Sequence, residues 1–212
     1  MGNIIAKDPD FWCSTDDPGQ ERHNADWMKR VPDSKFLSEL SILGTHNTLY
    51  YSYGGVEGLW VWCQSWVLRI QLNMGIRFLD IRCQASNGDM LLNHGGYKLG
   101  TLTDTLTCCV NFLQIHPTEC VIVWIAEENS KLAAHELRDA MKPFLERFRG
   151  FVLYQRLMPT LCEARGKLVI LADYKIEGND NMMKYENYGG MAICDIWKPD
   201  SCAQKLMASM IT

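Results

Sequence analysis

Short apolar runs of strand length alternate with helix-like segments along most of this chain, and this alternation constrains the fold more than any other feature. The runs are rich in branched and aromatic residues and lie at 36–44, 75–83, 90–95, 119–127, 167–174 and 191–198. Such near-continuous apolarity is typical of parallel strands buried on both faces. Helical spacing occurs between them at 64–73, 102–115 and 132–148.

This pattern predicts an α/β sheet of βα units. A TIM-type (β/α) barrel is the leading architecture, and a doubly wound open sheet is the alternative. Residues 1–33 are polar and rich in proline, and they are expected to form an N-terminal lead-in with one short helical candidate at 24–30. Residues 34–212 are expected to form one barrel domain, because neither a linker nor an internal repeat divides them.

Composition restricts the classes of partner. The 212 residues are 47% hydrophobic and 22% charged, which is ordinary for a globular domain, and the net charge is -4. This charge provides no basic field that would gather nucleic acid, so any anionic ligand must be met by a few placed residues. The nine cysteines are odd in number and lack a CxxC pair, which favours reduced thiols over a disulfide framework or a zinc site.

The sequence also bears on location. We expect no secretory signal and no transmembrane span, because no window approaches the roughly 18 uninterrupted apolar residues of a membrane helix. A cytoplasmic protein is therefore predicted, with peripheral membrane attachment as the alternative. Gly2 directly follows Met1, which raises N-myristoylation as a hypothesis, although Ala6 stands where Ser or Thr is usual.

Three short motifs could carry chemistry. GTHNT contains His46 and Asn47 at the end of the first strand run, where α/β barrels gather catalytic groups. FLDIR sends Asp80 and Arg82 to one face of the second run, as a structural ion pair or as an arginine held ready for a phosphate oxygen. LLNHGG ends the third run with His94 beside two glycines.

Together these motifs indicate more than any one of them does. Phosphodiester cleavage by general acid and base needs one imidazole to deprotonate the attacking hydroxyl and another to protonate the leaving oxygen. An arginine can balance the phosphoryl charge. His46, His94 and Arg82 at successive strand ends predict such a site, whereas a histidine in a turn taken alone is more often simply hydrogen-bonded.

The segments SILGTHNT, CQSWVLRIQLNMGIRFLDIRC, MLLNHGG and FLQIHPTECVIVWI resemble, in order and spacing, the X domain of phosphatidylinositol-specific phospholipases C. The resemblance spans about residues 27–197. It implies a distorted TIM-type barrel, with about six of its eight strands present, and an active site at the carboxyl ends of the strands. The implied enzyme is a phosphoric diester hydrolase, or lyase, that acts on phosphatidylinositol at a membrane surface and needs no cofactor.

The resemblance also implies residue roles. His46 matches the base that deprotonates the inositol 2-hydroxyl, and His94 matches the acid that protonates the diacylglycerol oxygen. The products would be diacylglycerol and inositol 1,2-cyclic phosphate. Arg82 matches the arginine that bacterial-type members use in place of calcium, so no metal requirement is predicted.

Several positions depart from the bacterial pattern. Asn47 stands where those members usually have Asp, and the mixture resembles trypanosome-type enzymes that cleave glycosylphosphatidylinositol, which keeps that lipid open as a substrate. Asp195 and Trp197 resemble an Asp-x-Tyr pair that binds and stacks on inositol. Ala126 and Asp173 replace basic residues, which implies altered headgroup recognition.

Length argues for a second reading. The family's eight-stranded barrel usually needs roughly 250 residues, so the C-terminal part and a distal Asp that orients the base histidine are expected to be missing. The chain would then be a catalytically impaired relative that binds lipid headgroups or a protein. A third reading, a metal-dependent glycerophosphodiesterase, lacks its His-Arg-Gly signature here.

Overall fold

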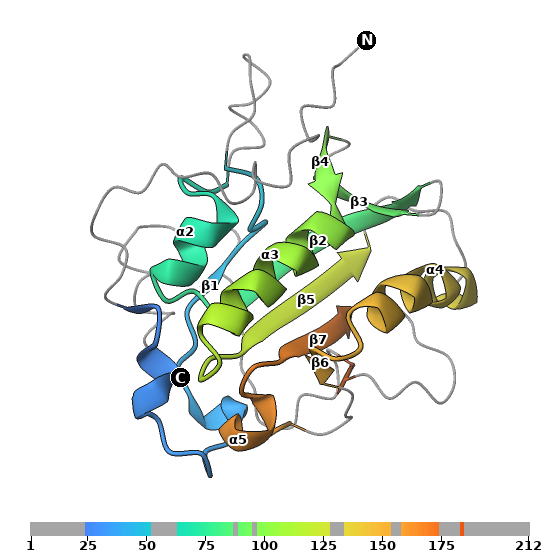
Figure 1. Cartoon of the computed structure of the whole chain (residues 1–212). Helices are drawn as coiled ribbons and strands as arrows, with labels where there is room; N and C mark the ends of the chain where they lie inside the picture. The colour runs from blue at the N-terminus through green and yellow to red at the C-terminus, as the bar shows by residue number, and fades with distance from the viewer. Residues whose placement is uncertain are drawn as a thin grey trace, which may run out of the picture.

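A parallel sheet forms the centre of the protein (Figure 1). The computed structural model describes residues 24–51, 63–86, 89–94, 97–127, 134–153, 158–173 and 183–184. The longest parallel strands are β2 (Phe78–Ser86), β5 (Val121–Glu127) and β7 (Leu168–Asp173), which are adjacent in that order. The shorter strands β1 (Gly44–Thr45), β6 (Val152–Leu153) and β8 (Met183–Lys184) are also parallel to their neighbours. The α/β prediction is confirmed.

One predicted strand runs the other way. The run at 90–95 forms β3 (Asp89–His94), which pairs antiparallel with β2 and with β4 (Tyr97–Thr101). The expectation of a parallel βα unit here was therefore wrong. The physical reason is the connection, because only residues 87–88 separate β2 from β3, and a parallel crossover needs a dozen or more.

The first strand run is mostly not a strand. Residues 36–44 were expected to be extended throughout, but they contain the 3-10 helix η4 (Leu37–Glu39), and only Gly44 begins β1. The helical candidate at 24–30 forms the 3-10 helix η3 (Trp27–Arg30). The last run, at 191–198, and residues 1–23 of the lead-in lie outside the described residues, so the proposed domain boundaries stay predictions.

The helices agree well with the sequence. The three expected helices are α2 (Leu68–Asn73), α3 (Leu102–Ile115) and α4 (Ala134–Arg147). A shorter helix, α5 (Leu161–Ala164), was not anticipated. In α3, Thr101 caps the first turn by accepting a hydrogen bond from the Asp104 N–H at 3.1 Å, and the helix ends just before Pro117. None of the described helices has the length and apolarity that a membrane crossing needs.

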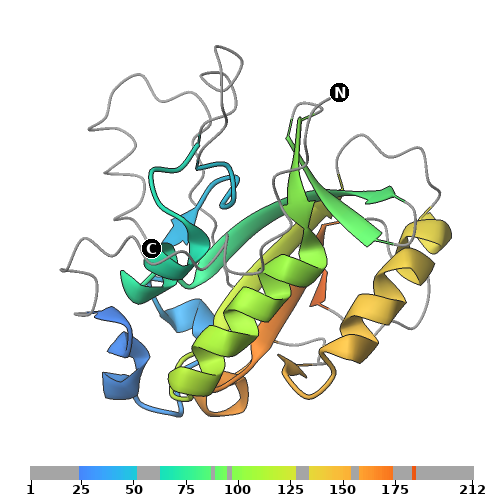
Figure 2. The same cartoon turned by 45° about the horizontal axis from the view of Figure 1, so that its top comes forward.

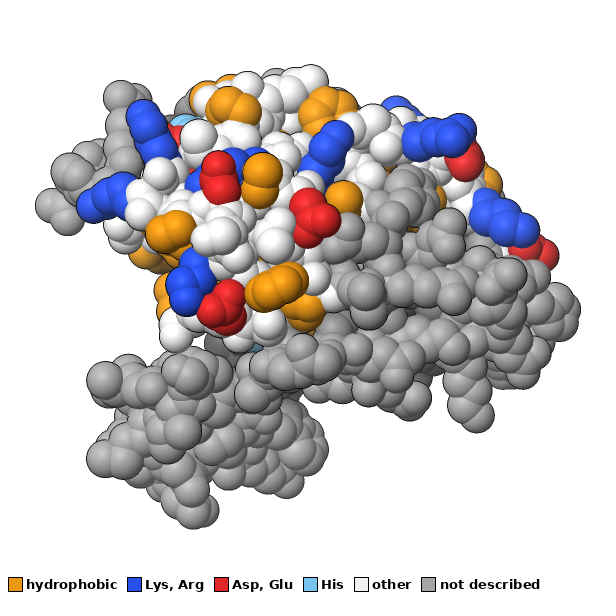
Figure 3. Space-filling view, turned by 90° about the horizontal axis from the view of Figure 1, so that it is seen from below, with side chains coloured by type: hydrophobic (Ala, Val, Ile, Leu, Met, Phe, Trp, Pro, Cys, Tyr) orange, Lys and Arg blue, Asp and Glu red, His pale blue; other side chains and the backbone are white. Residues whose placement is uncertain are grey.

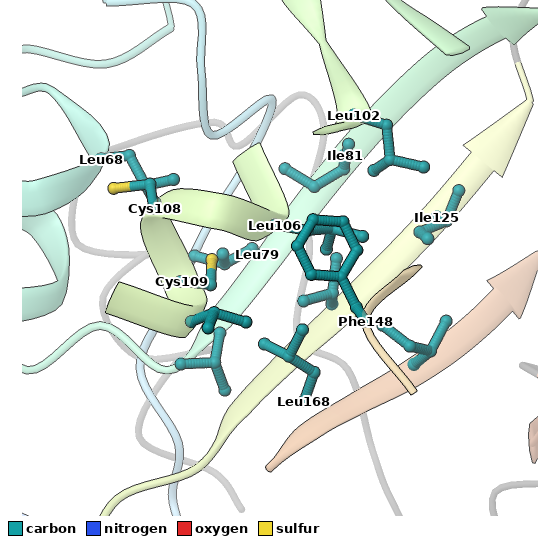
Figure 4. Packing of buried hydrophobic residues seen from close by; sticks show 14 of the residues in the cluster. Leu68, Leu79, Ile81, Leu102, Leu106, Cys108, Cys109, Ile125, Phe148 and Leu168 are labelled. Atoms are coloured by element: carbon teal, nitrogen blue, oxygen red, sulfur yellow. The ribbon is translucent and has the colours of Figure 1, made fainter. Parts of the chain in front are cut away.

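Helices α3 and α4 cover one face of the sheet (Figures 1 and 2). Alternate residues of each strand point to this face because side chains alternate along an extended chain. Leu79 and Ile81 of β2 are buried in a large cluster with Leu106 of α3 and Phe148, which follows α4 (Figure 4). The same alternation sends Asp80 and Arg82 to the other face, as predicted.

The other face of the sheet is apolar at one end and polar at the other. At the beginning of the strands, Phe78, Ile122 and Val169 are in register and pack with Met28 and Leu37. In the next row Asp80 is in register with Trp124, and one row further Arg82 is in register with Ala126, which pairs with Asp173. Polar groups thus appear toward the carboxyl ends of the strands.

The outer surface mixes apolar and charged groups. Seen from below, hydrophobic side chains lie between charged ones across the described surface (Figure 3). The large apolar residues with the most exposure among those described are Phe36, Leu43, Trp66, Met74 and Ile115. None of the six cysteines in the described ranges is in a disulfide.

A buried ion pair lies at the beginning of β2 and β5. Arg77 and Glu119 are both 0% exposed, and Nη2 of Arg77 lies 2.9 Å from Oε2 of Glu119. The guanidinium also donates to the carbonyl oxygens of Leu72, Ile76 and Ala25 at 2.6–2.8 Å. Burial lowers the pKa of Arg77, and the Glu119 carboxylate opposes that effect. The pair is therefore fully hydrogen-bonded, which is what a buried charge requires.

Replacing Arg77 by Met is expected to lower the free energy of unfolding by about 3–5 kcal/mol, because it leaves Glu119 as an unpaired buried charge. Urea unfolding followed by circular dichroism measures the change. The control is Glu146→Gln, which removes an exposed pair with Arg149 at 3.7 Å and should leave stability unchanged. Equal effects of the two substitutions would contradict the assigned role.

Candidate active site

The turn after β1 carries the first histidine. Gly44 and Thr45 pair with Phe78 and Leu79, and the chain then bends through His46 and Asn47. Asn47 is the one non-glycine residue in the described ranges with a positive φ, at 44°. Asparagine tolerates this left-handed conformation better than most residues, which explains its place in the turn.

β2 holds this turn from one side. The Thr48 N–H donates to the Asp80 carbonyl at 3.0 Å, and the Asp80 N–H donates to Thr48 Oγ1 at 2.9 Å. The Asn47 N–H donates to Asp80 Oδ2, also at 3.0 Å. Asp80 therefore fixes the turn with both its backbone and its side chain.

Asp80 also faces the His46 ring. Its Oδ2 lies 3.0 Å from His46 Nδ1, close enough for an ion pair with the protonated ring. Burial alone would raise the pKa of Asp80, but the His46 and Asn47 contacts and the charge of Arg82 outweigh burial, so the pKa lies below its ordinary value. The carboxylate is thus ionised at neutral pH and can stabilise a protonated His46.

The Asn47 side chain connects the two histidines. Its Nδ2 lies 3.0 Å from His46 Nε2 and 3.2 Å from His94 Nδ1. If Nδ2 donates in both contacts, the two ring nitrogens accept, and a neutral His46 ring then carries its proton on Nδ1, which faces Asp80. Asn47 Oδ1 is buried and makes no hydrogen bond within the described residues.

Arg82 lies beside the same carboxylate. Its Nε and Nη2 are 3.4 and 3.5 Å from the two Asp80 oxygens, which makes a long, weak contact. The Arg82 side chain remains 28% exposed, whereas Asp80 is 4% exposed. The guanidinium therefore contacts Asp80 while part of it remains open to solvent, and its role toward an anion stays a prediction.

His94 has neighbours that the motifs did not indicate. The Tyr50 ring packs edge-on against it with centroids 5.1 Å apart, and Cys63 Sγ lies 4.0 Å from Nε2. Burial and the charge of Asp80 raise the pKa of the Cys63 thiol, which keeps it protonated at neutral pH. No spacing rule connects Cys63 to a histidine so far along the chain, so sequence alone could not have found this contact.

The structure therefore brings His46, Asn47, Asp80, Arg82 and His94 into one site. This is possible because β3 is antiparallel to β2, so that its last residue returns past the middle of β2 toward the end of β1. Asp195 and Trp197, predicted to bind substrate, lie outside the described residues. Within the described ranges, no cluster of three or more His, Cys, Asp or Glu side chains could hold a metal ion.

Comparison with known proteins decides the family. The family model described as PI-PLC X 1 matches residues 33–189. The chain belongs to the PI-PLC X family. The resemblance of the motifs to the X domain of phosphatidylinositol-specific phospholipases C is therefore confirmed.

Individual members of the PI-PLC X family support this placement. A 1-phosphatidylinositol phosphodiesterase from Listeria monocytogenes is 29% identical over 160 residues, covering 69% of this chain and 48% of the relative. PI-PLC X domain-containing protein 1 from Danio rerio is 25% identical over 171 residues, covering 65% of this chain and 55% of the relative. The chain thus spans about half the length of these curated relatives.

The fold comparison agrees. The solved phosphatidylinositol-specific phospholipase C from Listeria monocytogenes superposes with a TM-score of 0.65 at 26% identity, covering 78% of this chain and 63% of that one. A Staphylococcus aureus structure gives a TM-score of 0.66 at 22% identity, covering 81% of this chain and 59% of that one. The sheet is therefore of the bacterial PI-PLC, TIM-type barrel class, and within the described residues it does not close into a barrel.

Replacing Asp80 by Asn should make the free energy of unfolding less dependent on pH in the acidic range. The folded-state pKa of Asp80 is depressed, so its contribution is present above the unfolded value of about 3.9 and is lost as pH falls through the folded value. We expect Asp80→Asn to lower stability by about 1–3 kcal/mol at pH 7, with the gap narrowing below about pH 4. Urea titrations from pH 3 to 7 test this, with the exposed Asp139→Asn as control; a gap constant with pH would contradict it.

Proposed function

We propose that this chain cleaves the phosphodiester bond of phosphatidylinositol or of its glycosylated form. The products are diacylglycerol and inositol 1,2-cyclic phosphate. The observation that carries the proposal is the Asn47 amide, whose Nδ2 lies within 3.2 Å of a nitrogen in each of the two imidazoles, with Arg82 beside the same carboxylate that faces His46. Two rings fixed so close together fit a base and an acid acting on one phosphorus.

In this proposal His46 is the base. Its Nε2 takes the proton of the inositol 2-hydroxyl, and the hydroxyl oxygen attacks phosphorus. Because a neutral ring nitrogen has one lone pair, the substrate hydroxyl must first replace the Asn47 amide at Nε2. Asp80, 3.0 Å from Nδ1, stabilises the imidazolium that forms.

His94 is the acid. It gives a proton to the diacylglycerol oxygen as the bond from that oxygen to phosphorus breaks, and the new bond to the 2-oxygen completes the cyclic phosphate. Arg82 donates hydrogen bonds to the phosphoryl oxygens, where negative charge must be balanced. Its 28% exposure and its long contact with Asp80 are consistent with this additional role.

We propose that this reaction needs no metal. Calcium sites take six to eight oxygen ligands, often from several carboxylates. Here Asp80 already faces His46 and Arg82, and the fixed positive charge of Arg82 would repel a divalent ion. Arg82 thus supplies the charge that a metal would otherwise provide.

The remaining expectations concern the lipid and its setting. Asp195 and Trp197 are proposed to bind and stack on the inositol ring, and the lipid is proposed to be met at a membrane surface. The protein is proposed to be cytoplasmic or peripherally attached, with Gly2 acylation as one route to attachment. No nucleic-acid partner is proposed.

Incubation of the purified protein with phosphatidylinositol vesicles in excess chelator should yield inositol cyclic phosphate, detected by phosphorus NMR. His46→Ala and His94→Ala should each reduce the rate by at least about 10²-fold, the usual contribution of a general acid or base. The control is His116→Ala, because His116 pairs with Asp26 on another part of the molecule. Absence of product from the wild type, with vesicle binding retained, would favour a headgroup-binding module instead.

Replacing Asn47 by Asp should shift the pH profile of kcat to higher pH. A carboxylate beside both imidazoles favours their protonated forms over their neutral forms. The base must be neutral and the acid protonated, so both limbs of the profile should shift to higher pH. The control is Asn111→Asp on the exposed side of α3; an unshifted Asn47→Asp profile would argue against the bridging role.

A further inference from the structure

A buried glutamine on α2 makes hydrogen bonds to the turn that carries His46. Gln71 is 3% exposed and uses both its donor group and its acceptor. Its Nε2 donates to the Thr48 carbonyl at 2.8 Å and to the Trp66 carbonyl at 2.7 Å, and its Oε1 accepts from the Thr45 hydroxyl at 2.8 Å. The side chain therefore binds the residue before His46 and the residue after Asn47.

The turn between these two contacts needs such support. Asn47 has a φ of 44°, in a region that non-glycine residues occupy at a cost. Thr48 Oγ1 closes the turn by donating to the Thr45 carbonyl at 3.0 Å. Gln64, just before α2, adds a further bond by donating to the His46 carbonyl at 2.5 Å. The segment before α2, through Gln64, therefore also holds in place the backbone that carries His46 and Asn47.

We infer that Gln71 is a positioning residue that sets the orientation of His46 and Asn47 by forming hydrogen bonds at both ends of their turn. This inference rests on the proposed function, since it assigns a further role in the same site. Asp80 holds the turn from β2, and Gln71 holds it from α2, so the His46 ring has a fixed place between two elements. The hydrogen bonds of Gln71 go to Thr45, Thr48 and Trp66 and not to the reacting groups, so its effect on the reaction is indirect.

The test replaces Gln71 by Met, which has a similar length but cannot form these bonds. At a temperature where the variant is folded, kcat should fall by at least about tenfold, with KM changed by less than about threefold. Gln71→Glu should recover part of the rate at low pH, where the neutral acid can donate one hydrogen bond, and lose it as the acid ionises. The control is Gln114→Met, which changes an exposed glutamine on α3.

A second readout does not depend on activity. In protein labelled with ¹⁵N-histidine, and with His46 assigned from His46→Gln, the ring nitrogen signals of His46 should shift in Gln71→Met, whereas those of His116 should not. Unchanged His46 signals, or a kcat within about twofold of the wild type, would overturn the inference. If the wild type itself is inactive, the proposed function fails and the His46 signals alone decide. If Gln71→Met does not fold, Thr45→Val removes one of the three bonds and takes its place in the same measurements.

Discussion

The buried pair of Arg77 and Glu119 organises the rest of the molecule. A guanidinium without solvent needs a partner for its donors, and here the partners come from distant parts of the chain: the carboxylate that precedes β5, the end of α2 and the segment before η3. These segments must therefore meet at one point. The position of α2, fixed in this way at its C-terminal end, determines where Gln71 reaches the His46 turn.

Much of the fold followed from local pattern. The parallel strands β2, β5 and β7, together with α3, lie where their apolar periodicity indicated. The wrong predictions concern the direction of one strand and the extent of another. The run before His94 was treated as parallel because apolarity alone does not give direction, and residues 36–44 were treated as one strand although a 3-10 helix occupies their middle. Pairing partners and connection geometry, which decide both cases, are not encoded in the periodicity of a single segment.

The sequence predicted which residues gather in the site but not which of their side chains interact. Histidines, an arginine and an aspartate in strand-end motifs indicated which residues to bring together. The sequence argument assigned the orientation of His46 to a distal aspartate of the family and expected Asp80 to hold Arg82 in the site, whereas Asp80 also lies 3.0 Å from the His46 ring. Cys63 and Gln71 could not be foreseen, because their contacts join positions that share no spacing rule.

The left-handed backbone at Asn47 limits how the site can change over evolutionary time. A branched or bulky side chain there would distort the turn, so the residues best suited to that backbone are glycine, asparagine and aspartate. Of these, only the last two can reach both rings. Their codons differ in a single base, so one mutation can switch this position between a neutral and a charged neighbour for the histidines without disturbing the chain path around it.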